Sequence, residues 1–203
     1  MSKNVNYYKY ICLAKWLYPW GLGGFFFTML LNERHTRRER LLKVAEAMAT
    51  SARTAPKGKG FDIIEILIIT DEHIAELSAA MLRYSEKSGL KFFIRDAGNL
   101  QHAEAVVLIG TKIQTHGLNC GYCGFPTCDE KNGHPEIPCS LNSVDVGIAI
   151  GSACATAADM RVDSRVMFSA GRAAQELGWM PECSNIYAIP ISCSSKNPFF
   201  DRK

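Results

Sequence analysis

The feature that most constrains this chain is a group of four cysteines in the segment NCGYCGFPTCDEKNGHPEIPC. They are Cys120, Cys123, Cys128 and Cys139, with the spacing C-x2-C-x4-C-x10-C. Four thiolates this close in sequence, on a loop rich in glycine and proline, are typical of a metal or iron–sulfur site. The spacing therefore predicts that residues 117–140 form a loop built around a bound metal centre.

The residues between the cysteines suit that role. The first two cysteines are separated by two residues, which lets both sulfurs turn toward one centre. Gly121 and Gly124 permit backbone angles that other residues resist, and Pro126 fixes the chain shortly before the third cysteine. Cys139 then closes the site from a longer stretch of loop.

Three kinds of chemistry fit four neighbouring cysteines. A single [4Fe–4S] cluster is favoured, since four thiolates complete its ligand set. Structural zinc also takes four cysteines, although zinc knuckles of similar spacing usually place a histidine third, where this chain has Cys128. His116 and His134 lie close enough in sequence to replace a cysteine ligand. Disulfides are the third kind, but a chain of 203 residues can bury a core without such cross-links.

The run CGYCGFPTC, residues 120–128, resembles the cluster-binding iron–sulfur domain of electron-transfer complexes. Those complexes include the B subunit of the Rnf complex and the large corrinoid subunit of acetyl-CoA synthase systems. In that domain four cysteines bind one [4Fe–4S] cluster, and the sequence motif CGxCGxPxC recurs. The resemblance implies that the four cysteines of this loop are cluster ligands. The fourth, Cys139, lies closer in sequence here than is usual in that domain.

Composition and charge limit the class of protein. The apolar and charged fractions are ordinary for a soluble globular protein, and the length suits one domain with a small appendage. The formal charge of +3 equals the three lysines of residues 1–28, so the rest of the chain is neutral. A neutral body carries no electrostatic footprint for nucleic acid. Eight cysteines without an evident pairing scheme favour a reducing cytoplasm.

Residues 1–28 differ in composition from the rest of the chain and form a hydrophobic aromatic extension. The uncharged stretch after Lys15 ends at Glu33, which is shorter than the roughly 20 residues that a spanning helix needs. Arginines just downstream, such as Arg34 and Arg37, give the positive flank of a membrane-proximal segment. The favoured interpretation is that Met29 is the true start, with association with the membrane as the alternative. The domain prediction is therefore an extension at residues 1–28 and a single domain at residues 29–203.

Periodic apolar residues predict helices and strands that alternate along the body. Helices are expected at residues 36–53, 71–89, 143–159 and 163–178, with Thr36, Asp71 and Asp163 as caps. Strands are expected at residues 63–69, 91–95, 104–110 and 186–192, and Pro190 predicts an edge position for the last. The pattern predicts an α+β fold, with α/β as the alternative.

Two further stretches carry functional predictions. The first helix exits into a basic, glycine-bearing loop in which Arg53, Lys57 and Lys59 are candidates for phosphate contacts, a simple helix exit being the competing interpretation. The helix expected at residues 143–159 is unusually rich in small residues. A helix this apolar and small belongs in the core or in a dimer interface.

Residues from Met29 onward resemble a family of small bacterial and archaeal ferredoxin-domain proteins. The resemblance rests on NERHTRRERLLKVAEAM, SARTAPKGKGFDIIEI, the cysteine loop, GRAAQELGW and KNPFFDR, and so covers nearly the whole body. It implies a bound cluster and a redox role.

That family is in turn similar to the FMN-dependent nitroreductase fold, a dimeric α+β fold with a mixed sheet flanked by helices and flavin at the subunit interface. The segment ARTAP, residues 52–56, resembles the A-R-x-A-P segment beside the flavin of that fold. The similarity implies a homodimer and FMN as a further cofactor, with Arg53, Lys57 and Lys59 as its phosphate contacts. Nitroreductases follow this segment with serine and later asparagine, where this chain has Lys57 and Gly60.

The leading hypothesis is a cytoplasmic iron–sulfur redox protein that exchanges electrons with a partner protein or a small-molecule acceptor, as an electron carrier or a flavin-linked oxidoreductase. The alternative from a different class is a module without catalysis, in which zinc holds a loop for partner binding. A redox or oxygen sensor ranks last, because the sequence offers no DNA-binding motif.

Overall fold

The computed structural model describes residues 30–200. The contacts within the chain divide it after Arg37, and the body from Arg38 onward is described by itself. The predicted boundary at residues 28 and 29 and the aromatic extension lie outside the described residues. The helices are α1 (Glu33–Thr54), α2 (Glu72–Ser88), α3 (Phe92–Leu100), α4 (Cys128–Asn132), α5 (Ser140–Asp159) and α6 (Phe168–Glu176). The strands are β1 (Ile64–Ile69), β2 (Ala105–Thr111), β3 (Asp163–Ser164) and β4 (Tyr187–Ser192), and short 3-10 turns cover Gly58–Gly60 and Pro198–Phe200.

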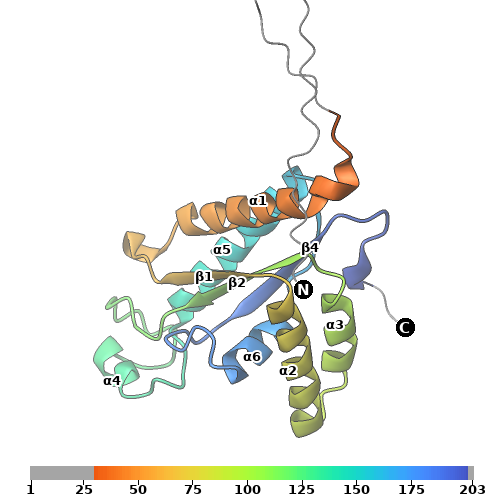
Figure 1. Cartoon of the computed structure of the whole chain (residues 1–203). Helices are drawn as coiled ribbons and strands as arrows, with labels where there is room; N and C mark the ends of the chain where they lie inside the picture. The colour runs from red at the N-terminus through yellow and green to blue at the C-terminus, as the bar shows by residue number, and fades with distance from the viewer. Residues whose placement is uncertain (1–29, 201–203) are drawn as a thin grey trace, which may run out of the picture. The chain divides into compact units, whose positions relative to one another are not determined.

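The four strands form one sheet in the order β1-β2-β4-β3. The neighbouring strands β1, β2 and β4 are labelled in Figure 1. All three pairings are antiparallel, so the sheet of the described residues is not the mixed sheet that the resemblance implied, and the interior strand β2 is buried at every residue. Helices and an antiparallel sheet in one body confirm the predicted α+β class over the α/β alternative.

Alternate residues of β2 enter two separate cores, which shows that helices cover both faces of the sheet. Val106 and Leu108 belong to the core formed with α2, α3 and α6. Ala105, Val107 and Ile109 belong to the core formed with α1 and α5. Because side chains alternate between the faces of a strand, a strand with both faces covered is apolar at every position.

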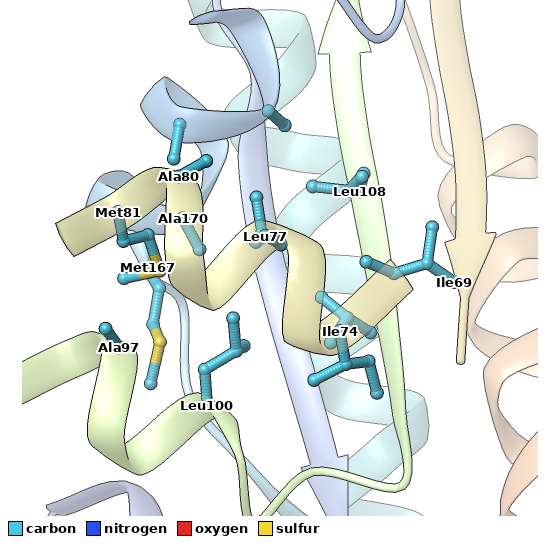
Figure 2. Packing of buried hydrophobic residues seen from close by; sticks show 14 of the residues in the cluster. Ile69, Ile74, Leu77, Ala80, Met81, Ala97, Leu100, Leu108, Met167 and Ala170 are labelled. Atoms are coloured by element: carbon cyan, nitrogen blue, oxygen red, sulfur yellow. The ribbon is translucent and has the colours of Figure 1, made fainter. Parts of the chain in front are cut away.

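The core beneath α2 is assembled from elements that are distant in sequence. Figure 2 shows Leu77 of α2, Leu100 of α3 and Leu108 of β2 contributing to it, with Met167 and Ala170 from the start of α6. The buried face of α1 forms part of the other core. The helix expected at residues 36–53 is confirmed, and its buried residues recur at helical spacing: Leu41, Val44, Ala45, Met48 and Ala52.

The strand expected at residues 91–95 is wrong, because this stretch begins α3. Phe93, Ala97 and Leu100 are buried at the spacing i, i+4 and i+7, which is one face of a helix. Ser78 Oγ donates to the Ala97 carbonyl at 3.0 Å and joins the helix to α2. The aromatic pair at the start of α3 suited a strand locally, and packing against α2 decided for the helix.

The three predicted caps are also wrong in their detail. Thr36 lies inside α1, which begins at Glu33, and its hydroxyl donates to the Glu33 carbonyl. Asp71 occupies the capping position of α2, but its side chain makes no capping hydrogen bond and pairs with Arg38 instead. Asp163 lies in β3 and accepts hydrogen bonds from the amide and hydroxyl of Ser194.

Pro190 lies in β4, which is an interior strand and not the expected edge. The amide of Glu104 donates to the Ile191 carbonyl on the side of β2. Ala188 and Met167 exchange both of their backbone hydrogen bonds on the opposite side. By the strand's alternation the nitrogen of Pro190 faces this second side, where pairing with β3 begins only one residue later. The proline is tolerated because the short β3 leaves this position of the ladder open.

Helix α5 is the one helix within residues 30–200 that is long and apolar enough to cross a membrane by length and composition. A core helix of a folded body meets the same criterion. Val146, Ala149, Ala153 and Ala157 are buried in the core with α1 and the sheet. The helix therefore has a place in the core, which is one of the two places predicted from its small side chains, the other being a dimer interface.

Candidate functional site

The cysteine loop, residues 117–140, connects β2 to α5 and contains the five-residue helix α4. Gly121 and Gly124 have φ angles of +73° and +89°, in the left-handed region that favours glycine. The amide of Gly124 donates to the Gly121 carbonyl at 2.9 Å and closes a tight turn around Cys123. The predicted role of these glycines is thereby confirmed.

Cys128 has the most specific surroundings of the four thiols. Its amide donates to Asn119 Oδ1 at 2.7 Å, and the amide of Asn119 donates to the Cys128 sulfur at 3.3 Å. This N–H donor lowers the pKa of the Cys128 thiol. The hydroxyl of Thr115 and the amides of Leu118 and Gly117 act in the same direction, whereas burial raises the pKa. Backbone donors around a sulfur favour the thiolate, which is the form that binds metals.

The structure does not gather the four sulfurs into one ligand set. Cys120 is exposed, Cys123 and Cys128 are partly buried, and Cys139 is buried at the residue before α5. Among the described residues, no three side chains of His, Cys, Asp or Glu are placed to hold a metal ion. Four thiols on one glycine-bearing loop still fit a cluster by the chemistry of the donor set.

The remaining residues of the loop fix its shape. Phe125 stacks on His134 with ring centroids 5.0 Å apart, and the buried Lys131 donates to the His134 carbonyl at 3.1 Å. The hydroxyl of Ser140 donates to the Tyr122 carbonyl at 2.9 Å and ties the loop to α5. Tyr122 is 77% exposed, so it does not shield the sulfurs from water.

The basic loop, residues 53–60, connects α1 to the approach to β1. The Arg53 guanidinium pairs with Asp62 and donates to the Ile64 carbonyl. Lys57 Nζ donates to the carbonyls of Ala52 and Arg53, at 2.6 Å each, and so satisfies the last turn of α1. Burial lowers the pKa of Lys57. Both candidate phosphate ligands are therefore engaged within the chain.

The middle of the basic loop contacts a buried histidine and a buried carboxylate. The amide of Gly58 donates to both oxygens of Asp145, at 3.0 and 3.1 Å. Lys59 Nζ donates to the His116 carbonyl at 3.1 Å, and its cation lies 4.7 Å from the Phe61 ring centroid. The three predicted phosphate contacts, Arg53, Lys57 and Lys59, remain a prediction, and each has a partner inside the protein.

The pair of His116 and Asp145 is the functional candidate that the sequence did not identify. His116 Nε2 lies 3.0 Å from Asp145 Oδ2, and the two side chains are 1% and 5% exposed. The distance is that of an ion pair, but neither ring nitrogen makes an aligned hydrogen bond among the described residues. Asp145 is the one charged residue between Ser140 and Ala158 of an apolar helix. A lone acid in such a helix indicates a buried partner, and that signal was available in the sequence.

The cysteines outside the loop have the properties of packed apolar residues, to which the sequence assigned no role. Burial raises the pKa of Cys154, and it raises the pKa of Cys183 to about 12. The seven cysteines within residues 30–200 are all free thiols. A buried thiol with a raised pKa is a poor nucleophile and a poor metal ligand.

Comparison with known proteins gives one matching family model and one relative in sequence. A family model described as "Uncharacterized protein containing a ferredoxin domain (DUF2148)" matches residues 136–202, which include Cys139 but not the other three cysteines of the loop. A curated protein of Archaeoglobus fulgidus is 40% identical over 182 residues, covering 86% of this chain and 98% of the relative. The ferredoxin domain supports a redox role.

The fold is similar to that of solved nitroreductases. One with bound FMN, from Desulfitobacterium hafniense DCB-2, has a TM-score of 0.53 and 13% identity, covering 76% of this chain and 78% of that chain. A protein assigned as a nitroreductase, in complex with FMN, from Desulfovibrio desulfuricans has a TM-score of 0.52 and 12% identity, covering 79% and 78%. At these identities the likeness concerns the fold alone, and it confirms the nitroreductase-like prediction.

Proposed function

This chain belongs to the family of proteins containing a ferredoxin domain, and on that basis we propose that it is an iron–sulfur redox protein. Its cysteine loop binds one [4Fe–4S] cluster through Cys120, Cys123, Cys128 and Cys139. The cluster supplies one-electron transfer when bound. The observation that carries the proposal is the Cys128 sulfur, held by backbone donors on a loop with three further thiols.

The chain's own residues have three tasks in this function. The Asn119 amide stabilises negative charge on the Cys128 sulfur, because an N–H donor to a sulfur ligand favours the electron-rich state and shifts the potential upward. Gly121 and Gly124 allow the loop to bend so that exposed Cys120 turns inward. The Ser140 hydroxyl donates to the Tyr122 carbonyl, which keeps the neighbouring Cys139 close to the first part of the cysteine loop.

The partner and the location belong to the same proposal. The protein is cytoplasmic and exchanges electrons with a redox partner protein or a small-molecule acceptor. It acts as a homodimer through the solvent face of α5, where Val144 and Ile148 are 55% and 41% exposed. Gly147 and Gly151 on this face have open space where a Cβ would lie, so a second helix can approach closely. Light scattering on the Ile148→Glu variant tests the dimer, which the added charge should dissociate.

FMN does not fit the basic loop in the described structure, so no step is assigned to it. Its predicted phosphate contacts already donate to carbonyls or pair with a carboxylate inside the chain.

The test is the visible spectrum and the iron and sulfide content of full-length protein purified without oxygen, before and after reduction. A broad brown absorption that bleaches on reduction is expected, with about four irons and four sulfides per chain. The Cys139→Ser variant should lose iron, because a serine hydroxyl does not replace the thiolate ligand. Cys193→Ser, outside the cysteine loop, is the matched control and should keep its iron. A colourless protein that carries zinc would contradict the proposal and support a structural zinc module.

A further inference from the structure

The basic loop already binds an anion, and that anion is the side chain of Asp145 in α5. The amide of Gly58 donates to both carboxylate oxygens of Asp145, at 3.0 and 3.1 Å, from a position 87 residues away in sequence. His116 Nε2 lies 3.0 Å from Oδ2 of the same carboxylate. A backbone amide and an imidazole that converge on one carboxylate have the geometry of an anion-binding site.

The site is closed to solvent. The side chains of His116 and Asp145 are 1% and 5% exposed, and Phe61 stacks on the imidazole with ring centroids 5.9 Å apart. The Gly58 backbone also lies close to the imidazole, since a Cβ there would be 3.1 Å from His116 Cε1. A phosphate from solvent would therefore have to displace the carboxylate to reach the Gly58 amide.

The neighbouring cations do not supply a second phosphate position. Arg53 is used by Asp62 and the Ile64 carbonyl, and Lys57 is used by the last turn of α1. Lys59 donates to the carbonyl of His116 and so joins the basic loop to the segment that precedes the cysteine loop. Arg53, Lys57 and Lys59 each direct at least one donor at a group of the chain itself.

We propose that Asp145 is the resident anion of a built anion-binding site, formed by the Gly58 amide and the His116 imidazole, and that it fills the loop in which the sequence predicts a cofactor phosphate. The site then holds together the basic loop, the segment that precedes the cysteine loop and α5, and it does not bind FMN. When the Asp145 carboxylate is removed by substitution, the site binds small carboxylate anions from solution. Its occupancy by Asp145 does not depend on the metal that the cysteine loop binds.

Chemical rescue of full-length Asp145→Ala tests the proposal. Removal of the carboxylate leaves the Gly58 amide and His116 without their anion, so Tm falls below that of wild type. Sodium formate should raise Tm in a concentration-dependent manner in this variant but not in wild type, since a ligand stabilises the state that binds it. Sodium chloride at equal ionic strength is the salt control. Asp62→Ala removes the exposed partner of Arg53 and is the matched variant, for which no rescue is expected.

Should Asp145→Ala fail to fold, its refolding yield in formate against chloride gives the same answer. Equal Tm values and equal yields in the two salts would overturn the proposal. The flavin part is tested separately by titration of wild-type protein with FMN, with quenching of flavin fluorescence as the signal. No binding is expected. If FMN binds, and the Lys57→Ala variant binds it at least about tenfold more weakly, or by about 1.4 kcal/mol, the proposal that the basic loop does not bind FMN is overturned.

Discussion

The cysteine loop and the basic loop both carry residue types that bind cofactors, but the structure treats them in opposite ways. In the basic loop every candidate side chain is directed at a carbonyl or a carboxylate of the chain. In the cysteine loop Cys120 is exposed, and the donors around Cys128 stabilise the thiolate that a metal needs.

The difference teaches how to separate a binding loop from a structural one. Cations and glycines beside a helix end indicate a phosphate site only if their donors are still available. In the cysteine loop, Cys120, Cys123 and Cys128 are neither buried nor paired, so their thiols remain available to an external group. Four experiments would break or sharpen this contrast.

The largest expected effect is the loss of the metal centre in Cys128→Ser. A serine at this position removes the ligand that the Asn119 amide stabilises, so the variant should lose its visible absorption and most of its iron. Cys154→Ser, on α5 outside the loop, should keep both. Iron analysis and visible absorption on anaerobic samples measure this, and an unchanged Cys128→Ser spectrum would contradict the ligand assignment.

The second largest expected effect is the loss of stability in Asp145→Ala. This change breaks a buried pair and leaves His116 and the Gly58 amide unpartnered, which should cost about 3–5 kcal/mol of unfolding free energy. Asp62→Ala removes one partner of an exposed ion pair and should cost only about 0–1 kcal/mol. Urea denaturation measures both, and equal losses would mean that the buried contact does not hold the basic loop.

The thiols of the metal-free protein should differ in their pH dependence. The lowered pKa of Cys128 means that its thiolate is present at a lower pH than that of an ordinary thiol. Burial raises the pKa of Cys183 to about 12, so that group remains a thiol at neutral pH. At pH 7 alkylation by iodoacetamide should be at least about tenfold faster at Cys128. Mass spectrometry of the peptides measures the rates, and equal rates would contradict the difference between the sites.

The smallest expected effect concerns Lys57→Ala. The ammonium donates two hydrogen bonds to the carbonyls of Ala52 and Arg53, so its removal should cost about 0.5–1.5 kcal/mol of unfolding free energy. Inorganic phosphate should not stabilise the wild-type protein, because the Lys57 ammonium is already used. Thermal unfolding with and without phosphate measures this. Stabilisation by phosphate that disappears in Lys57→Ala would make the basic loop a binding loop after all.

Much of the fold and the cysteine loop is determined by local sequence. The inward face of α1 was predictable because a helix repeats every 3.6 residues, and β2 because an apolar run indicates a strand covered on both faces. The bends at Gly121 and Gly124 were predictable because glycine reaches positive φ with no steric cost. Each of these depends on neighbours within a few residues.

What only the tertiary structure decided depends on residues far apart in the chain. Packing against α2 made residues 92–100 a helix, although the aromatic pair at its start favours a strand. The order of the strands placed Pro190 inside the sheet, at a gap in the ladder. The Gly58 amide meets Asp145 across 87 residues, and this contact fills the basic loop with an internal carboxylate. The residue type determines which groups a side chain can donate to. The tertiary structure determines which acceptor lies within reach, and a buried donor pairs with it because leaving a buried polar group unpaired is costly.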